Sequence, residues 1–295
     1  MGAAKGSFLR TGDGRLRLFW RLVSFMGISL LVTTLVAIVL PPSLLSTSVA
    51  MLVGAVVGGW LVLLEDGRAP GALGFYADAG ALSETARGTA LGVAVGVATV
   101  LLIALLGGLR WAPEDGSIMQ WLRGGLGALL FFTVPAAAEE AVLRGYPLQA
   151  LAESWGAAWA LVVTSIAFGA FHLGNPNVTL LGVTNVAVAG LFLGVVYLKT
   201  ASLWWATGAH LGWNWSHGFL TDVSVSGLDL IDAPFYEGIS RGPSWLSGGS
   251  FGPEGSVVST LVVLAASLLC WRADWLRPSS AALAAEPLAL IEAES

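Results

Sequence analysis

Long runs of apolar residues, separated by short polar segments, dominate the chain. Eight of these runs are about 20 residues long, which is the length of an α-helix that crosses the hydrocarbon core of a bilayer. The runs are Leu18–Leu40, Leu44–Leu64, Thr89–Leu109, Leu126–Gln149, Ala157–Leu173, Leu180–Leu198, Ser202–Leu220 and Ser256–Trp271. The pattern predicts an all-α, polytopic membrane protein with about eight transmembrane helices.

The composition supports this class. Of the 295 residues, 56% are hydrophobic and 11% are charged, whereas an ordinary soluble domain has roughly 25% charged residues. A soluble fold would lack the charge to cover its surface, so we expect the lipid bilayer as a partner. The net charge of −5 gives no reason to expect binding to nucleic acid. The single cysteine, Cys270, excludes a disulfide within the chain.

The distribution of Lys and Arg predicts the orientation, because cytoplasmic loops carry an excess of positive charge. If the N-terminus lies inside, the inner side receives eleven of these residues and the outer side three. The inner ones are Lys5, Arg10, Arg15, Arg17, Arg21, Arg68, Arg87, Arg144, Lys199, Arg272 and Arg277, and the outer ones are Arg110, Arg123 and Arg241. We expect a multi-pass protein of a bacterial inner membrane with both termini in the cytoplasm.

The chain divides into four regions by this pattern. Residues 1–125 hold the first three helices, 126–220 the next four, 221–255 an extracytoplasmic loop, and 256–295 the last helix and a cytoplasmic tail. The loop is rich in Gly and Ser, which favours a flexible connector over a lid on a cavity. The Ala-rich tail after Arg277 is expected to be solvated or weakly interfacial.

Two adjacent carboxylates, Glu139 and Glu140, interrupt the otherwise apolar stretch Phe131–Leu143. Ionisable residues inside membrane helices are costly, and they usually serve a function. Arg144 lies one helical turn after Glu140, on the same face and within reach of an ion pair. Glu139 is rotated by about 100° from that face, which leaves it free for chemistry.

Proline and glycine near the glutamates affect the helix that carries them. Pro135 lies four residues before Glu139 and is expected to kink the helix. Gly145 and Pro147 leave open an alternative, in which the helix ends early and both glutamates lie at the membrane interface.

All three histidines follow the glutamates in sequence. His172 ends the fifth predicted helix, and His210 lies in the seventh, with Asn214 one turn later on the same face. At a rise of 1.5 Å per residue, Glu139, His172 and His210 converge near the middle of the bilayer, on its cytoplasmic side. His217 is two turns beyond His210 and is expected near the outer interface, outside the site.

Three short motifs, in this order, resemble those of the CAAX protease and bacteriocin-processing (CPBP) family of intramembrane proteases. The matches to the EExxxR, FxxxH and HxxxN/D motifs of that family are Glu139–Arg144, Phe168–His172 and His210–Asn214. Each motif alone is weak, but three in order, each on a predicted membrane helix, form a strong signal. The resemblance covers roughly Leu126–Leu220, a third of the chain.

The resemblance implies an all-helical membrane fold with a polar intramembrane cavity that opens to the cytosol. It also implies an intramembrane endopeptidase that hydrolyses a peptide bond near the C-terminus of a membrane-associated protein or peptide. Some members of the family cleave prenylated tails, so a lipid-modified substrate is one option. Glu140, Arg144 and Phe168 are expected to structure the site.

The same resemblance implies roles for four catalytic residues. Glu139 and His172 would hold and deprotonate a water molecule, and His210 and Asn214 would donate hydrogen bonds to the oxyanion of the tetrahedral intermediate. General physical chemistry agrees with these roles, because a buried carboxylate is a useful base near neutrality. An imidazole and an amide are both competent oxyanion donors.

The need for a metal stays open at this point. Glu139, His172 and His210 would also suit a zinc ion with water in the fourth position. The chain has no HExxH motif, and the two histidines fall on different helices, so their spacing does not decide. We favour catalysis without a metal or another cofactor and keep zinc as the alternative.

Two other functions compete with proteolysis. A proton-coupled transporter would explain the buried carboxylates and histidines as a proton relay. It does not explain the spacing of His210 and Asn214, and the chain has no detectable internal repeat. A non-catalytic immunity or scaffold protein of the membrane would keep the motif residues for folding.

Overall fold

The computed structural model describes residues 7–290, and helices form at all eight apolar runs. The main helices are α1 (Leu18–Val39), α2 (Leu44–Glu65), α3 (Ala81–Leu105), α4 (Ile118–Glu140), α5 (Tyr146–Trp155), α6 (Ala157–Phe171), α7 (Leu180–Thr200), α8 (Leu203–Trp215) and α10 (Val257–Arg272). The shorter elements are α9 (Ser244–Ser247), α11 (Ser280–Ala284) and the strands β1 (Leu109–Pro113) and β2 (Tyr236–Ser240). The class of an all-α membrane protein is therefore confirmed.

Within residues 7–290, five helical stretches are long and apolar enough to cross a membrane. They are Leu18–Val39, Leu44–Glu65, Ala81–Leu105, Ile118–Trp155 and Leu180–Thr200. The apolar helices α6 and α10 are shorter, and α8 continues into a π-helical turn at Ser216–Leu220. The number of eight spans stays a prediction.

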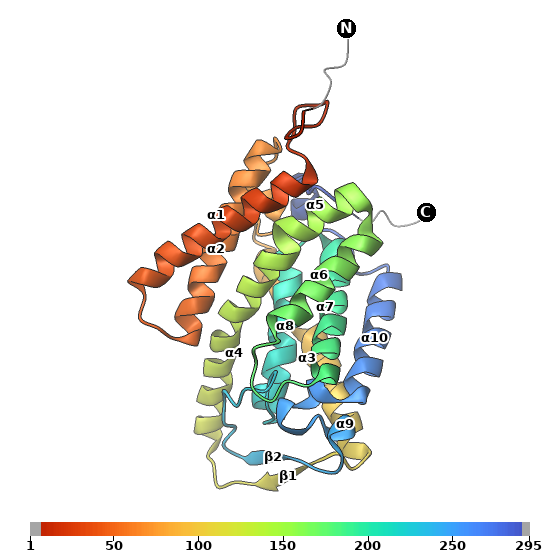
Figure 1. The fold of residues 1–295 in the computed structure, drawn as a ribbon. Coiled ribbons are helices and arrows are strands. Elements are labelled where there is room, and N and C mark those ends of the chain that lie inside the picture. Colours follow the sequence, from red (N-terminus) through yellow and green to blue (C-terminus); the bar gives the residue numbers. More distant parts are fainter. Residues whose placement is uncertain (1–6, 291–295) are drawn as a thin grey trace.

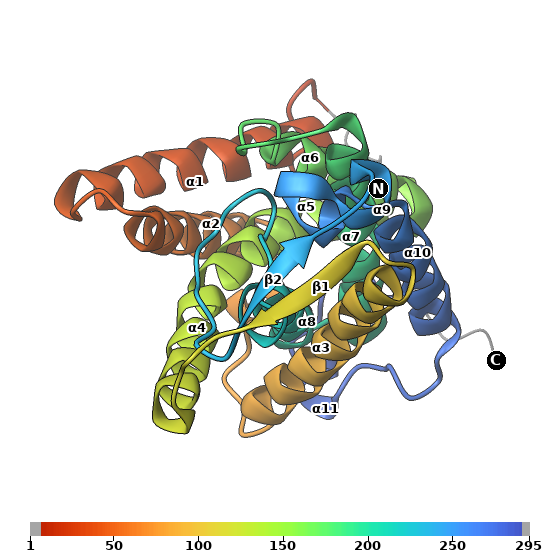
Figure 2. The same ribbon diagram turned by 90° about the horizontal axis from the view of Figure 1, so that it is seen from below.

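The helices pack in pairs along the chain and across it. α3 lies along α8, α6 along α7, and α10 against α7 and α3. The hairpin of α1 and α2 leans away from this bundle, as Figure 1 shows at the upper left, and contacts it through α4 and α5. The described chain begins and ends at the same end of the bundle (Figure 1). The two strands lie across the opposite end, which Figure 2 shows from below.

The close packing of α3 on α8 depends on glycine. A Cβ atom added to Gly92 would lie 2.0 Å from the Ala209 carbonyl oxygen, and one added to Gly212 would lie 2.1 Å from the Thr89 carbonyl oxygen. Small residues let helix backbones approach in this way in membrane proteins. The contact fixes the position of α8, which carries two of the candidate site residues.

Two helices begin earlier than the pattern of apolar residues predicts. α3 begins at Ala81 instead of Thr89, since the carboxylate of Glu84 in its first turn accepts hydrogen bonds of 2.5 Å from the hydroxyls of Tyr76 and Ser202. α4 begins at Ile118 instead of Leu126, because Ser117 and Gln120 form a capping box that starts the helix.

A π-helical turn at Ala141–Gly145 connects α4 to α5 directly. The apolar pattern predicts a helix that bends at Pro135 and ends at Gln149, whereas the observed helical stretch runs on to Trp155. The helix therefore does not end early, and the place of both glutamates inside the membrane stays a prediction. Turns of this kind occur frequently at functional sites, and this one begins directly after Glu140.

The segment 221–255 is folded, so the prediction of a flexible connector is wrong. β2 pairs with β1 in an antiparallel ladder, and the carboxylate of Asp222 accepts hydrogen bonds from the backbone of Ala233 and Gly238. Burial raises the pKa of the Asp222 carboxyl. These backbone bonds, which no pattern of apolar residues encodes, give the Gly-rich segment its shape.

The tail after Arg277 also differs from its prediction. Leu288 is 9% exposed, and its backbone N–H donates to the side chain of the buried Gln149 on α5. Tyr76 shares a hydrogen bond with Ser279 in the same tail. Up to residue 290 the tail therefore folds back onto the bundle and is not a solvated end.

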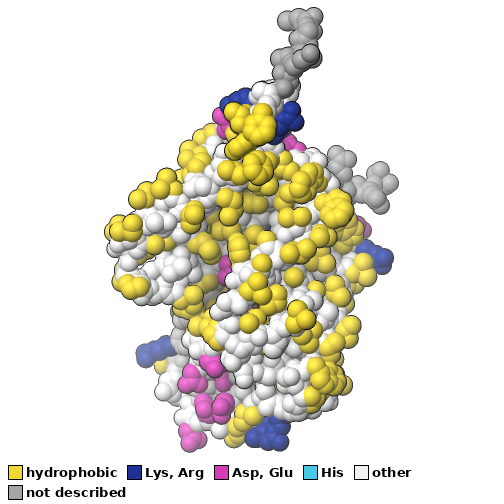
Figure 3. All heavy atoms as spheres, in the orientation of Figure 1, with side chains coloured by type: hydrophobic (Ala, Val, Ile, Leu, Met, Phe, Trp, Pro, Cys, Tyr) yellow, Lys and Arg dark blue, Asp and Glu magenta, His cyan; other side chains and the backbone are white. Residues whose placement is uncertain are grey.

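The surface fits a protein in a bilayer. In Figure 3, hydrophobic side chains cover most of the visible face, and charged side chains gather near its two ends. Exposed apolar residues occur on α1, α4, α6 and α10, including Leu30, Leu130, Ile166 and Leu269. Such a broad apolar surface would be a liability in water and is expected against lipid.

Candidate active site

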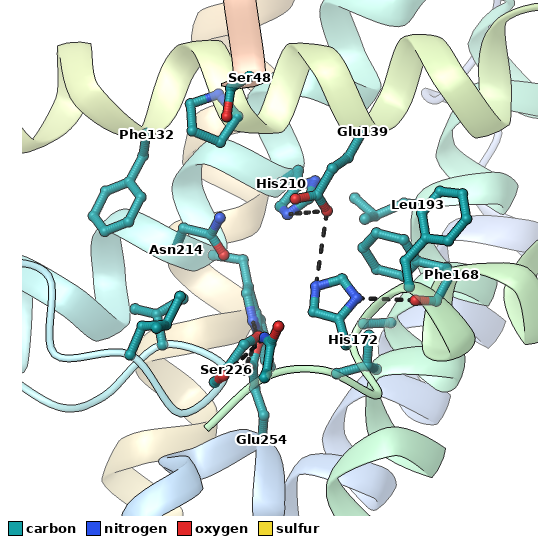
Figure 4. Close-up of a pocket in the computed structure, with 18 of the residues that line it drawn as sticks. Ser48, Phe132, Glu139, Phe168, His172, Leu193, His210, Asn214, Ser226 and Glu254 are labelled. Carbon is teal, nitrogen blue, oxygen red and sulfur yellow. Dashed lines mark hydrogen bonds and ion pairs between the residues drawn. The ribbon is translucent and has the colours of Figure 1, made fainter. Parts of the chain in front are cut away.

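A cavity of about 430 Å³ lies between the helices and the folded segment 221–255. Its wall includes residues of α2, α4, α6, α7, α8 and α10. Glu139, His172, His210 and Asn214 all line it, and Figure 4 shows the Glu139 carboxylate with His210 beside it and His172 below it. The structure therefore brings together all four predicted catalytic residues. Most other lining side chains are apolar.

Glu139 is the centre of this cluster. Its Oε2 atom lies 3.9 Å from the Nε2 atom of His172 and 3.9 Å from the Nε2 atom of His210. Oε2 has no hydrogen-bond partner among the described residues, although it is buried. Two imidazole nitrogens thus face one carboxylate oxygen across a gap that is longer than a direct hydrogen bond.

The backbone fixes the tautomer of His172. Its Nδ1 atom lies 2.9 Å from the carbonyl oxygen of Phe168, one turn earlier in α6. A carbonyl oxygen only accepts, so Nδ1 carries the hydrogen and donates. In the neutral ring Nε2 then has a free lone pair, and this atom faces Glu139. The geometry gives His172 a proton-accepting nitrogen on the cavity side.

Glu140 connects His210 to Arg144. Its Oε1 atom accepts from Arg144 Nη1 at 3.0 Å and lies 2.9 Å from Nδ1 of His210. The side chains of Glu140 and Arg144 have no exposed surface. The predicted ion pair is thus present, and it also orients the imidazole of His210 with Nε2 toward Glu139.

Phe168 and Gly190 hold the guanidinium of Arg144 from other directions. The guanidinium carbon lies 4.4 Å from the centroid of the Phe168 ring, and Nη2 donates to the carbonyl oxygen of Gly190 at 3.0 Å. The edge of the same ring also packs against His172 and His210. Phe168 therefore touches three of the motif residues at once.

Asn214 lies one turn after His210 on α8 and reaches the cavity, as the spacing predicts. His217 does not line the cavity. It is fully buried, and neither ring nitrogen has a hydrogen-bond partner among the described residues. Its position near the outer interface stays a prediction.

Four polar residues of the cavity were not predicted, namely Ser48, Asn175, Ser226 and Glu254. Ser226 and Glu254 come from the segment 221–255, and Figure 4 shows them at the end of the cavity away from Glu139. Neither belongs to a motif or to an apolar run. Only the fold of the Gly-rich segment brings them to the site, so no local signal in the sequence could have identified them.

The cavity extends from Glu139 toward the end of the bundle that carries the strands. On α4 its lining residues, Phe131, Phe132 and Pro135, come before Glu139, on the side where the helix begins. The lining residues of α8 likewise run from His210 toward segment 221–255. The described termini lie at the other end (Figure 1). The resemblance implies a cavity that opens to the cytosol, whereas this cavity extends from Glu139 away from the end of the bundle at which the described chain begins and ends.

The distances between the candidate ligand atoms bear on whether the site could hold a metal ion. No group of three or more His, Cys, Asp or Glu side chains in residues 7–290 is placed to hold a metal ion. Glu139 Oε2 and each Nε2 atom are 3.9 Å apart, whereas tetrahedral zinc ligands at about 2.0–2.1 Å from the metal lie roughly 3.3 Å from each other. Zinc would fit only if the side chains moved closer together.

Comparison with known proteins agrees with the motifs. The family model described as "Type II CAAX prenyl endopeptidase Rce1-like" matches residues 121–216, about a third of the chain. The match contains all three motifs and confirms the resemblance to the family of CAAX-type proteases. Comparisons with curated proteins and with solved structures gave no significant match.

Proposed function

We propose that the protein is an intramembrane endopeptidase that hydrolyses a peptide bond of a membrane-associated protein or peptide with activated water. One observation carries this proposal: Glu139 Oε2 faces two imidazole Nε2 atoms at equal distances of 3.9 Å in the wall of a cavity. A water molecule at hydrogen-bond distance of all three atoms fits such a gap. A bond near the C-terminus of the substrate is suggested by the family resemblance alone.

The first step of the proposed reaction is proton removal. Water between Glu139 and His172 gives its proton to one of these two bases while its oxygen attacks the carbonyl carbon of the peptide bond. The C–N bond then breaks, and the same proton passes to the leaving amine. This sequence is balanced without a cofactor, and we propose that no metal takes part.

The oxyanion would be stabilised by Asn214 and His210. The amide of Asn214 donates directly. His210 donates from Nε2 only as an imidazolium, because Nδ1 already carries a hydrogen toward Glu140. The carboxylate of Glu140 favours that positive charge. Glu140 and Arg144 thus act through His210 and position it.

We further propose that the protein lies in a bacterial inner membrane with cytoplasmic termini. The excess of Lys and Arg on the terminal side supports this orientation. The substrate then reaches Glu139 from the outer half of the bilayer. This differs from the cytosolic access that the resemblance implies.

The proposal is tested with purified protein in detergent micelles. A peptide library and a quenched prenyl-peptide are incubated with the wild type and with His172→Ala, and products are identified by mass spectrometry. We expect cleavage by the wild type and a rate at least about 100-fold lower in the variant, since a general base contributes that much. Equal inertness of both, together with proton flux in protein-containing vesicles, would favour a transporter instead.

A further inference from the structure

Glu254 is a second buried carboxylate in the cavity, outside the three motifs. Its side chain lines the cavity, and the residue is 5% exposed. Oε1 accepts from the indole N–H of Trp213 at 2.8 Å, and Oε2 accepts from the hydroxyl of Ser226 at 2.6 Å. Figure 4 places Glu254 beyond Asn214, at the far end of the cavity from Glu139. A carboxylate has about four lone-pair sites that can accept hydrogen bonds, so Glu254 can still accept further ones.

No cation of the described chain neutralises Glu254. The ion pairs among residues 7–290 do not include it, although they include Glu140, which meets Arg144. His217 packs against the ring of Trp213, but it is fully buried and neither of its ring nitrogens forms a hydrogen bond with Glu254. Buried charges in proteins are usually paired with an opposite charge. Hydrogen bonds from neutral donors, such as those of Trp213 and Ser226, replace such a partner only in part.

The far end of the cavity holds a carboxylate without a cation. Glu254 lines it there, and no Lys or Arg side chain of the described residues lines any part of the cavity. The nearby Arg144 points away from the cavity toward Glu140 and Gly190. A substrate carboxylate that reached this far end would meet the like charge of Glu254, which is unfavourable in a medium of low dielectric constant.

We propose that Glu254 binds a positive charge of the substrate, so that the site selects peptides with an ammonium or guanidinium group that reaches the far end of the cavity. The inference rests on the proposed function. The stem of a Lys or Arg side chain suits the apolar part of the cavity wall, which includes Phe132, Leu228 and Leu230. Glu254 is thus the residue that determines specificity, while Glu139 performs the chemistry.

The test uses a set of matched apolar peptides in which one position at a time is Lys, norleucine or Glu. The wild type and Glu254→Gln are compared in detergent by kcat/KM for each peptide. We expect the wild type to prefer Lys over norleucine at one position by roughly 30-fold or more, because an interaction of a buried charge pair is worth that much. Glu254→Gln is expected to lose this preference, so that the ratio of its kcat/KM values for the Lys and norleucine peptides falls toward one.

Glu84→Gln is the matched control. Glu84 is also a buried carboxylate that accepts from two neutral hydroxyls, those of Tyr76 and Ser202, but it does not line the cavity. We expect this variant to keep the preference for Lys. Glu254→Asp keeps the charge and is expected to retain part of the preference, and thermal unfolding of each variant checks that the protein is folded.

Binding separates this inference from the proposed function. The affinity of the Lys and norleucine peptides for Glu139→Gln is measured by fluorescence anisotropy. Absent cleavage of every peptide contradicts the proposed function, whereas tighter binding of the Lys peptide that depends on Glu254 still supports a cation site. Equal binding and cleavage of the Lys and norleucine peptides, or a preference that survives in Glu254→Gln, would overturn the inference and leave Glu254 as an anchor of segment 221–255.

Discussion

Glu140 and Arg144 are fully buried, and each satisfies the other's charge. Taking two charges out of water is expensive, so such a pair contributes little net stability, but breaking it leaves one charge unpaired. His210 also depends on Glu140 for its orientation. At the residue scale, the second motif glutamate is therefore part of the support of the site and the first, Glu139, is its reactive group.

Arg144→Ala is expected to lower the free energy of unfolding by about 3–5 kcal/mol, because Glu140 would stay buried without its cation. The double variant Glu140→Gln with Arg144→Met should recover part of this loss. Unfolding in mixed micelles, followed by tryptophan fluorescence, measures both. A loss below about 1 kcal/mol in Arg144→Ala would show that water or another group compensates for the missing charge.

The sequence was most informative about single residues that lie on regular helices. The spacing of Glu140 and Arg144 predicts their contact, and that of His210 and Asn214 predicts that both reach one cavity. It could not reveal that Glu140 also binds His210, since 70 residues separate them. The sequence could not identify Glu254 either, because its position depends on contacts made by an irregular segment.

At the scale of elements, the contact of α3 with α8 positions His210 and Asn214. Four glycines, Gly88, Gly92, Gly208 and Gly212, let the two backbones approach. The run of apolar residues predicts each helix but not this pairing, because apolar periodicity says little about the partner of a helix inside a membrane. The end of α4 was likewise unpredictable, since a π-helical turn needs tertiary contacts.

Gly92→Ala is expected to push α8 away from α3, because the new Cβ atom would lie 2.0 Å from a backbone oxygen that has no room to move. Overpacking of this kind costs about 1–3 kcal/mol and should also lower kcat by displacing His210. Gly127→Ala on α4 is the control, since its Cβ atom would meet nothing within 4 Å. Equal melting temperatures and rates for both variants would contradict the role given to this contact.

At the scale of the whole molecule, the cavity and the described chain ends lie on opposite sides of Glu139. The class of membrane protein follows from composition, but the direction of the cavity does not, because it depends on which end of each helix faces the site. Residues of the folded segment 221–255 line the cavity toward the end of the strands. With the proposed cytoplasmic termini, we expect substrates to approach from the outer half of the membrane or from the lipid.

Labelling of single cysteines tests this orientation. In a Cys270→Ser background, Ser240→Cys in β2 and Ser7→Cys near the start of the chain are compared, because both positions are exposed. A membrane-impermeant maleimide added to intact spheroplasts is expected to label position 240 and to label position 7 only after permeabilisation. The reverse pattern would place the cavity on the cytoplasmic side and restore the access that the family resemblance implies.

The most direct test of the central claim is the rate of peptide cleavage by Glu139→Gln and Glu139→Ala, measured beside the wild type with and without a chelator. If the Glu139 carboxylate acts as a base without a metal, both variants are expected to lose activity by about 100-fold or more. The wild type is then expected to be unaffected by the chelator. Activity that disappears in chelator and returns with zinc, or that survives in Glu139→Gln, would contradict the account.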